Sequence, residues 1–345
     1  MDWNAPELRT DFRYVVVDRT TWGEVREVTD ITGGNITRKY LSELKDAASL
    51  NYSDTAQLLT IGEDYVRVYL DATGPDGVTE SVALGTFKVS TPSQNVSDHG
   101  TSGSATCYSV LQVLQGEGLA ETVTIPAGEP LIAYAAGIVS ARGLNVDVQS
   151  ETTATCTSDA VFTTDRNYLD VVIWCSQAAG FGTPSVDGYG TVVFRKYEDP
   201  AGKSPIREYG PGSLVMFPTY DHEFDTYDFP NKVIVTCSTP ESCVIGIAVN
   251  DDPDHPYSTV NRGRVVTATY DQDNLEDQAA ADARAAVLLS QVSAVESVTV
   301  SHLYDGSALQ DVVSVAGLGD FSIVEQDISL SPGCPVDDRA RRFVF

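Results

Sequence analysis

Alternation of apolar and polar residues dominates the first part of the chain. The segments "FRYVVVDR", "WGEVREV" and "YVRVYL" place hydrophobic side chains at every second position or in short β-branched runs. Period-two alternation is typical of strands that bury one face. The segment "DATGPDGVTE" supplies glycine, proline and Asp-Gly turn chemistry, and "ALGTFKV" follows it as a returning strand. We therefore predict a β-rich N-terminal region.

One segment of this region fits two structures. In "NITRKYLSELKDAASL", the spacing of Ile36, Tyr40, Leu44 and Ala48 suits one face of a helix. The segments on either side of it read as strands and turns. The pattern alone leaves helix and strand open for residues 36–48.

The pattern changes after residue 90. Residues 90–106 are rich in Ser, Thr, Gly and Asn, which is typical of a linker or long loop and marks a candidate domain boundary. Helical spacing follows, with Tyr108, Leu111 and Leu114 on one face. Two longer helices are predicted over residues 130–142 and 166–179, each ending at a glycine. These elements indicate an α/β module.

A second stretch of proline and glycine, residues 200–218, marks another candidate boundary. Several strands follow. The sequence then predicts an alanine-rich helix over about residues 273–291. Asp273 and Glu276 stand three positions apart at its start, as in a capping box. The remaining residues, 297–345, alternate like strands.

Two distant segments have a similar order of features. Each begins as an alternating strand, passes through a glycine-containing turn and reaches a Leu-Gly-x-Phe tetrad. The tetrads are Leu84-Gly85-Thr86-Phe87 and Leu318-Gly319-Asp320-Phe321. A true repeat would imply two related small β-barrels, one at each end of the chain.

Charge narrows the classes of function. The 345 residues carry a net charge of -27, which repels phosphates and anionic lipid headgroups. Sequence-independent binding to nucleic acid is therefore not expected, although an acidic passage would let nucleic acid slide through without sticking. No apolar run reaches the length of a membrane span, and the N-terminus lacks the pattern of a secretory signal, so we expect synthesis and assembly in the cytoplasm.

The six cysteines show no metal-binding spacing. The segment "VIVTCSTPESCVIGIAV" reads as a hairpin that sets Cys237 opposite Cys243. Two reduced thiols are expected in a cytoplasmic product, and a disulfide is the alternative.

Catalytic and metal-binding patterns are weak. His222 stands among Asp221, Glu223 and Asp225, and a second acidic cluster surrounds His255, but neither matches a known ligand spacing. We interpret both as solvated loops. Phosphate-binding loops, nucleophile elbows and zinc-protease motifs do not occur. A pair of catalytic carboxylates stays open, since 49 acidic residues always provide candidates. We expect no catalytic residues, metal or cofactor.

Two segments are candidates for contacts within or between chains. In "EFDTYDFPNKVIVTC", Phe224, Tyr227, Phe229 and Pro230 stand just before a strand, which suits an active-site loop or a domain seam. We favour the seam. Near the C-terminus, Arg339, Arg341, Arg342 and Phe343 combine arginine with an aromatic residue, which suits a partner contact. A solvated, charged terminus is the alternative.

The order of segments resembles the tail-tip or baseplate hub proteins of tailed bacteriophages, the late-control tail protein family. The pieces that carry the resemblance are "VALGTFKVSTP", "CYSVLQVLQGEG", "VTIPAGEPLIAYAAGIVSARG", "VDGYGTVVFRKYEDPAGKSPIREY" and "FDTYDFPNKVIVTC". It covers nearly the whole chain and looks closest to the hubs of siphophages that infect Gram-positive bacteria.

The resemblance implies a mainly β fold with an α/β insertion. Residues 1–95 are expected to form the first barrel, 96–205 the insertion, and 206–345 the second barrel with the long helix. It favours strand over helix for residues 36–48.

The resemblance also implies a homotrimeric structural virion protein. Such a protein joins the tail tube or distal tail protein to the tip or spike, surrounds the channel used by the tape-measure protein and DNA, and lies at the virion tail tip. The family offers no catalytic residues, and we expect no appended domain that would bring cell-wall hydrolysis. A tail-associated cell-wall or carbohydrate hydrolase, or a host glycan-binding tail protein, is the alternative.

Overall fold

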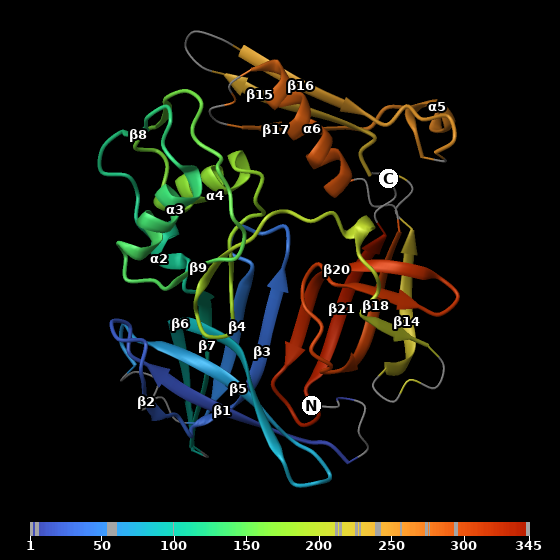
Figure 1. Cartoon of the computed structure of the whole chain (residues 1–345). Helices are drawn as coiled ribbons and strands as arrows, with labels where there is room; N and C mark the ends of the chain where they lie inside the picture. The colour runs from blue at the N-terminus through green and yellow to red at the C-terminus, as the bar shows by residue number, and fades with distance from the viewer. Residues whose placement is uncertain are drawn as a thin grey trace.

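The computed structural model of the chain consists mainly of β-strands with a few helices (Figure 1). It describes residues 3, 7–53, 61–98, 100–210, 213, 216–224, 227, 229–238, 243–255, 257–272, 275, 277–292 and 296–342. Figure 1 shows a large sheet below, a helical part at the upper left, and a small sheet with its helix at the top. Within these residues, no helix combines the length and the apolar character that crossing a membrane requires.

The large sheet draws its strands from both ends of the chain. The N-terminal strands are β1 (Arg9–Val17), β2 (Glu24–Glu27), β3 (Ile31–Lys39), β4 (Asp46–Tyr52), β5 (Tyr65–Thr73), β6 (Thr79–Ser97) and β7 (Gly100–Ser109). The C-terminal strands are β13 (Arg207–Tyr209), β14 (Met216–Phe224), β18 (Glu296–Leu303), β19 (Val312–Val315), β20 (Gly319–Ser329) and β21 (Pro335–Arg342). β3 and β20 pair antiparallel, and this pairing joins the two halves.

The strand order is β14-β18-β21-β20-β3-β4-β7-β6-β5-β1-β2, with β19 attached to β20 and β13 to β19. Among the described residues this path is open at both ends, so the two barrels expected from the sequence remain a proposal. Two apolar clusters fill the large sheet, and the one built on the N-terminal strands also includes Ile328 and Val336 of the C-terminal half. Leu50, Val68 and Phe87 belong to the N-terminal core, and Phe321 and Ile323 to the C-terminal one.

The insertion between the halves contains three helices and several short strands. These elements are α2 (Gln112–Gly116), β8 (Val123–Ile125), α3 (Leu131–Ser140), β9 (Val146–Val148), β10 (Ala160–Phe162), α4 (Tyr168–Ala178), β11 (Ser185–Val186) and β12 (Val192–Phe194). A short 3-10 helix, η1 (Pro200–Gly202), follows. α4 begins with a capping box, because the Asn167 side chain accepts from the Asp170 N–H and the Asp170 carboxylate accepts from the Asn167 N–H.

Side chains of the N-terminal half anchor the insertion. The indole N–H of Trp22 donates to the carbonyl oxygen of Gly143 at 2.9 Å. Lys45 Nζ donates to the Thr183 carbonyl oxygen at 2.7 Å, and burial lowers the pKa of Lys45 to about 8. Arg67, which is buried, donates to the carbonyl oxygen of Tyr189 at 2.9 Å. Polar side chains of one unit thus satisfy backbone oxygens of the other.

The small sheet has the order β16-β15-β17 and lies at the top of Figure 1. Its elements are β15 (Lys232–Ser238), β16 (Cys243–Val249), α5 (Thr259–Arg262), β17 (Thr267–Asp271) and α6 (Gln278–Val292). α6 packs its buried residues Ala285, Leu288 and Leu289 against Val233 and Val235 of β15. Gly246 of β16 lets the helix approach closely, since a Cβ there would lie 2.1 Å from the Ala281 carbonyl oxygen.

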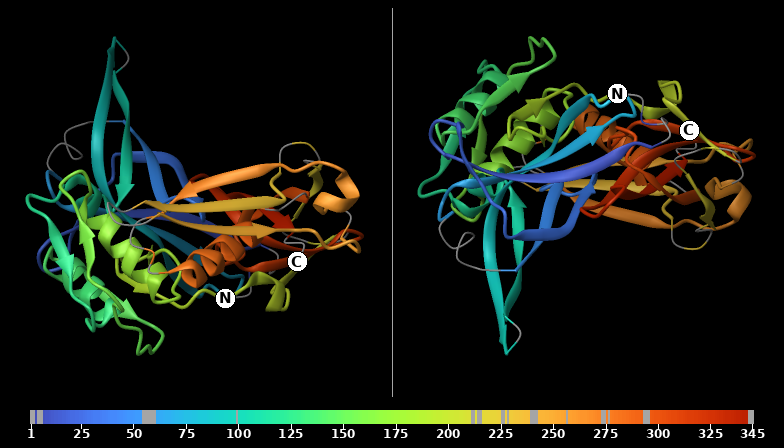
Figure 2. Two further views of the ribbon diagram at one scale, coloured as in Figure 1. Left: turned by 90° about the horizontal axis from the view of Figure 1, so that it is seen from above. Right: turned by 90° about the horizontal axis from the view of Figure 1, so that it is seen from below.

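The predicted linker at residues 90–106 is wrong. This stretch forms most of the β6–β7 hairpin, in which Asn95 pairs with Ser102 and Val96 with Thr101. The expected boundary near residue 95 therefore falls inside β6. Glycine and asparagine are depleted in strands, but a hairpin that leaves the body of the protein has little apolar surface to bury and tolerates polar residues (Figure 2).

Residues 36–48, which fitted both helix and strand, form the end of β3, the start of β4 and the turn between them. The helices predicted over 130–142, 166–179 and about 273–291 are confirmed as α3, α4 and α6, whereas Tyr108 lies in β7 and α2 is only one turn long. Asp273 and Glu276, the expected capping box of α6, lie outside the described residues.

The β15–β16 hairpin around the two cysteines is confirmed, but the predicted register is wrong by one residue. Cys237 pairs with Val244 and Ser238 with Cys243. Neighbouring residues of a strand face opposite sides of a sheet, so this register does not set the two cysteines opposite each other. Cys237 is a free, buried thiol.

Candidate assembly surfaces

The stretch from Phe224 to Pro230 connects the large sheet to the small sheet. Phe224 is the last residue of β14, is 56% exposed and packs against the ring of His222, with 4.4 Å between the ring centroids. Tyr227 is 70% exposed. Phe229 is buried directly before β15. The sequence motif therefore divides into an exposed aromatic part and a buried one.

Arg262 organises the buried part of this stretch. Its guanidinium lies over the Phe229 ring at 4.1 Å and donates to the carbonyl oxygens of Phe229 and Tyr227, each at 3.2 Å. The Phe229 ring also meets the edge of Tyr257, with centroids 5.3 Å apart. These contacts lie within the small-sheet unit. The seam between the insertion and the second half stays a prediction for Phe224, Tyr227, Phe229 and Pro230.

Asn231, which the sequence reasoning passed over, fixes the start of β15. It is fully buried, its amide donates to the Arg264 carbonyl oxygen at 3.0 Å, and its side-chain oxygen accepts from the Val266 N–H at 2.8 Å. In the sequence, Pro230 marks this strand start, but a proline has no N–H to donate. The Asn231 side chain supplies the hydrogen bonds, to the backbone groups of Arg264 and Val266.

The C-terminal arginines lie on β21, two strands away from β14. Arg339 pairs with Glu223 at 3.3 Å, and Arg342 pairs with Glu296 at 3.0 Å while its guanidinium lies over the Phe321 ring at 4.6 Å. Arg341 lies opposite Ser297 and Ser322 in the sheet, and Phe343 lies outside the described residues. The partner contact stays a prediction. Arg339 and Arg342 pair with carboxylates of the same chain, and Arg341 also takes part in an interaction.

β18 brings the two sequence candidates together. Phe224 of β14 pairs with Glu296 of β18, and Glu296 pairs in turn with Arg342 of β21. One oxygen of Glu296 contacts His222 at 2.7 Å, and the other contacts Arg342. His222 and Arg342 thus contact the same carboxylate, that of Glu296. Among the described residues, no three His, Cys, Asp or Glu side chains are placed to hold a metal ion.

A buried polar network lies near the opposite end of β18. Its members are Tyr209, His302, Asp305, Ser307, Gln326 and Asp338. His302 Nε2 is 3.0 Å from an oxygen of Asp338, and its Nδ1 is 2.8 Å from the Leu303 carbonyl oxygen. Both neighbours accept hydrogen bonds, so the doubly protonated imidazolium fits best.

Electrostatics agree with that protonation state. Burial lowers the pKa of His302, but the hydrogen bond and charge of Asp338, together with the charge of Asp305, outweigh it and the net direction is upward. Burial and the neighbouring Asp305 raise the pKa of Tyr209, whose hydroxyl donates to Asp305 at 2.7 Å. The network contains histidine, carboxylate and serine, but all are buried. We therefore assign it to structure rather than catalysis.

An apolar stripe covers the outer face of β16. Ile245, Ile247 and Val249 alternate along this edge strand and are 44%, 48% and 41% exposed, while the intervening positions face α6. The stripe was visible in the sequence as "CVIGIAV", but only the position of α6 shows which face it leaves uncovered.

No family model and none of the curated proteins matches the sequence. Solved structures do match the fold. The tail protein from Neisseria meningitidis MC58 superposes with a TM-score of 0.69 at 13% identity, covering 96% of this chain and 97% of that one. The prophage tail protein gp18 from Listeria monocytogenes EGD-e gives 0.55 at 12% identity, covering 96% and 95%.

A third match is the c3393 protein of E. coli, with a TM-score of 0.51, 10% identity and coverage of 91% and 74%. It is described as a component of the type VI secretion system that resembles the T4 bacteriophage tail proteins gp27 and gp5. The chain therefore has the fold of phage tail proteins over nearly its whole length.

Proposed function

We propose that the chain is a structural virion protein, the hub at the distal end of a bacteriophage tail. The observation that carries this proposal is the match to solved tail proteins across almost the full length of both chains. A match limited to one domain would support only a shared domain, and not a similar role for the whole chain. The likeness of the E. coli c3393 protein to gp27 and gp5 adds support for a place where tube and tip meet.

The arrangement of the two halves supports a trimer. Both Leu-Gly-x-Phe tetrads lie in hairpins of the large sheet, β5–β6 and β19–β20, and both Phe87 and Phe321 are buried. We infer that the halves are related barrel-like units joined by the β3–β20 pairing. Three copies with two such units each give a ring that fits a sixfold tail tube on one face and a threefold tip on the other.

The net charge fits a channel. A ring with -27 per chain repels DNA, so the genome and the tape-measure protein slide past without being held. Distal tail or tube subunits are the proposed partners on one face, and tip or spike proteins on the other. The siphophages of Gram-positive hosts remain the proposed setting, because the sequence motifs suit them.

We infer further that the chain is not an enzyme. A hydrolase would require exposed carboxylates in a cleft. A glycan-binding protein would require exposed aromatic side chains on the strands that can stack against sugar rings. Zymography on cell walls separates these functions. Clearing by the purified chain would establish hydrolysis and overturn the purely structural role.

Mass photometry tests the proposal itself. We expect the chain to form trimers alone or together with the tail tube or distal tail protein, and we expect threefold symmetry in images of reconstituted tips. A chain that stays monomeric and binds neither partner contradicts the proposal.

A further inference from the structure

A cleft of about 660 Å³ lies between the insertion, α6 and the turn after β3. Aromatic side chains from these units line it: Tyr40, Trp174, Phe181, Tyr197 and Tyr270. Leu41 and Val287 also face the cleft and remain 55% and 36% exposed. The cleft therefore offers uncovered apolar surface inside a concave site, which is the usual form of a binding pocket.

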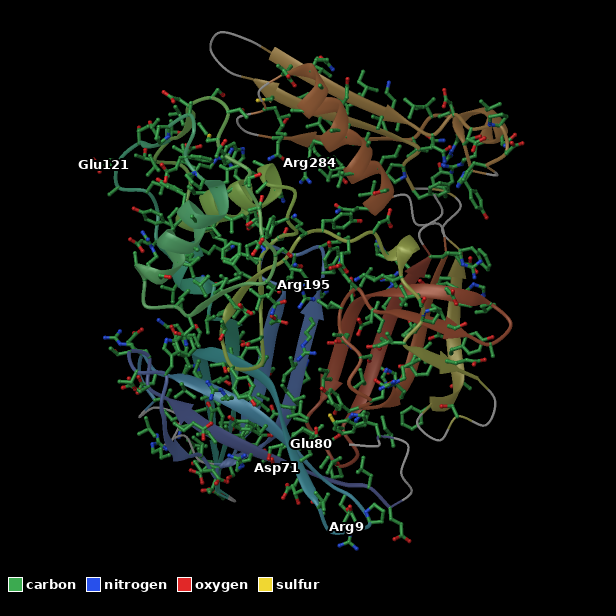
Figure 3. The ribbon with its side chains drawn as sticks, viewed as in Figure 1. Arg9, Asp71, Glu80, Glu121, Arg195 and Arg284 are labelled. Atoms are coloured by element: carbon green, nitrogen blue, oxygen red, sulfur yellow. The ribbon has the colours of Figure 1, made fainter. Side chains whose placement is uncertain are left out.

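Arg284 of α6 gives this cleft a positive centre (Figure 3). Its guanidinium donates to the side-chain oxygens of Gln272 at 3.3 Å and Gln177 at 3.0 Å, so two neutral groups hold it in place. Within the described part of the chain, no carboxylate forms an ion pair with it. Burial lowers the pKa of Arg284, and the charge of Tyr40 opposes that effect only in part. A desolvated cation without a counterion favours a ligand that brings a carboxylate.

The β6–β7 hairpin supplies a segment of matching chemistry. β6 pairs with β5 only as far as Lys88, and β7 pairs with β4 only as far as Gly103. β6 continues beyond Lys88 to Ser97, a further length of about 30 Å. Figure 2 shows this ribbon projecting from the body of the chain. Beyond Gln94 and Gly103, where the pairing with β4 ends, the ribbon has two strands only. Such an end is marginally stable by itself, so a docking partner would stabilise it.

The tip of the hairpin carries one apolar and one acidic side chain close together. Val96 is 70% exposed, and the exposed Asp98 follows it in the turn. Among the described residues Asp98 has no ion-pair partner. The tip thus presents an apolar side chain beside a carboxylate, which complements the apolar walls and the arginine of the cleft.

We propose that the hairpin tip of one copy docks into the cleft of a second copy, with Asp98 pairing with Arg284. In Figure 2 the hairpin and α6 lie on opposite sides of the molecule, so the contact forms between chains. A contact between two different surfaces repeats head to tail and closes into a ring when the rotation permits. This inference rests on the proposed trimer and identifies a contact that holds it together.

Charge exchange tests the contact. Self-association of the full chain is measured by sedimentation velocity for wild type, Asp98→Arg, Arg284→Glu and the double variant. Each single reversal should raise the dissociation constant about tenfold or more, because like charges then meet in the cleft. The double variant should return to within about threefold of wild type, since the pair is restored with opposite polarity.

Two kinds of control accompany the exchange. Glu121→Arg and Arg9→Glu reverse exposed charges away from the cleft, both labelled in Figure 3, and should leave the dissociation constant within about threefold of wild type. Arg284→Gln covers the case in which Arg284→Glu unfolds the chain. It should weaken association while resistance to urea stays equal or rises, because a desolvated charge is removed.

The outcomes separate this contact from the proposed function. Trimers that persist in both single variants overturn the hairpin contact and leave the tail-hub proposal intact. Weakening by the Arg284 variants but not by Asp98→Arg shows that the cleft binds an acidic group from another source, which also overturns the contact. A wild-type chain that forms no trimer, alone or in reconstituted tips, overturns both proposals.

Discussion

His302 is held by acceptors on both ring nitrogens, and this arrangement makes folding sensitive to pH. The groups facing it are Asp338 on β21, Asp305 in the loop after β18, and the hydroxyl of Tyr209 on β13, which is 3.4 Å from Nε2. Because the pKa of His302 is raised in the folded chain, folding favours the imidazolium. That contribution is complete below the unfolded pKa of about 6.5 and is lost as pH rises through the folded pKa.

His302→Gln should therefore cost more stability in acid than in base. Removing one partner of a buried ion pair costs about 3 kcal/mol, and we expect a loss of that order near pH 6. The loss should shrink at a pH above the raised pKa of His302, where the wild-type imidazole has lost its second proton. Urea unfolding at the two pH values measures the difference. An equal loss at both values, or a larger one in base, contradicts the prediction. Asp338→Asn should remove the same pH dependence.

The histidine of the buried network has little local signal in the sequence. His222 and His255 attracted attention because acidic residues surround them in the chain. His302 has no acidic neighbour within two positions, and its partner Asp338 lies on another strand. Its one local signal was the alternation of "ESVTVSHL", which places it on the same face as Val298 and Val300. A histidine at a core position of a strand indicates a buried network.

Gly246 is required by the packing of α6 on the small sheet. A side chain at this position would meet the Ala281 carbonyl oxygen at 2.1 Å and the backbone N of Asp282 at 2.8 Å. Backbone atoms inside a helix cannot move aside alone, so the whole helix must shift. We predict that Gly246→Ala destabilises the chain by about 1–3 kcal/mol, as overpacking usually does.

Gly137 provides the matched control. It lies inside α3, and a Cβ there meets nothing within 4 Å. Gly137→Ala should raise stability by about 0.5–1 kcal/mol, because alanine favours the helix and restricts the unfolded chain. Urea midpoints of the two variants measure the effects. A Gly246→Ala variant as stable as wild type would show that α6 does not approach β16 so closely.

Elements with a strong local signal were predictable. α3, α4 and α6 each have an apolar stripe, and the first two end at a glycine. The β6–β7 hairpin was not predictable, because Ser93, Gln94 and their neighbours are typical of loops. Its strands exist because Ser90 to Thr106 continue ladders begun by the buried residues Phe87 and Cys107. Cooperative extension of a sheet can thus override local propensity.

The pairing of β3 with β20, which joins the two halves of the large sheet, brings together residues from opposite ends of the chain. Ile36 lies opposite Ile328, and Thr37 donates to Asp327 at 2.5 Å across the same two strands. Neither strand carries a mark that identifies the other, because both read as ordinary alternating segments. The resemblance to tail proteins implied a mainly β fold, and the match to solved tail proteins confirms that coarse part of it. The cleft around Arg284 was invisible in the sequence, since its walls come from three separate regions.

The separate cores of the molecule predict that it does not unfold as one unit. The small-sheet core consists of Val233, Val235, Ala285, Leu288 and Leu289, whereas a much larger cluster fills the insertion. Stability follows the apolar area buried, so the small-sheet unit should open first. We expect amide hydrogen exchange to be faster in α6 and β15 than in α4.

Two matched substitutions make this prediction specific. Leu288→Ala and Leu169→Ala each remove a buried leucine and should each cost about 2–5 kcal/mol locally. If the units open separately, Leu288→Ala accelerates exchange in α6, β15 and β17 only, and Leu169→Ala accelerates it in the insertion only. Acceleration across the whole chain in either variant would show a single cooperative unit. If the two units open independently, the boundary between them lies at the cleft around Arg284, because that cleft has the insertion on one side and α6 on the other.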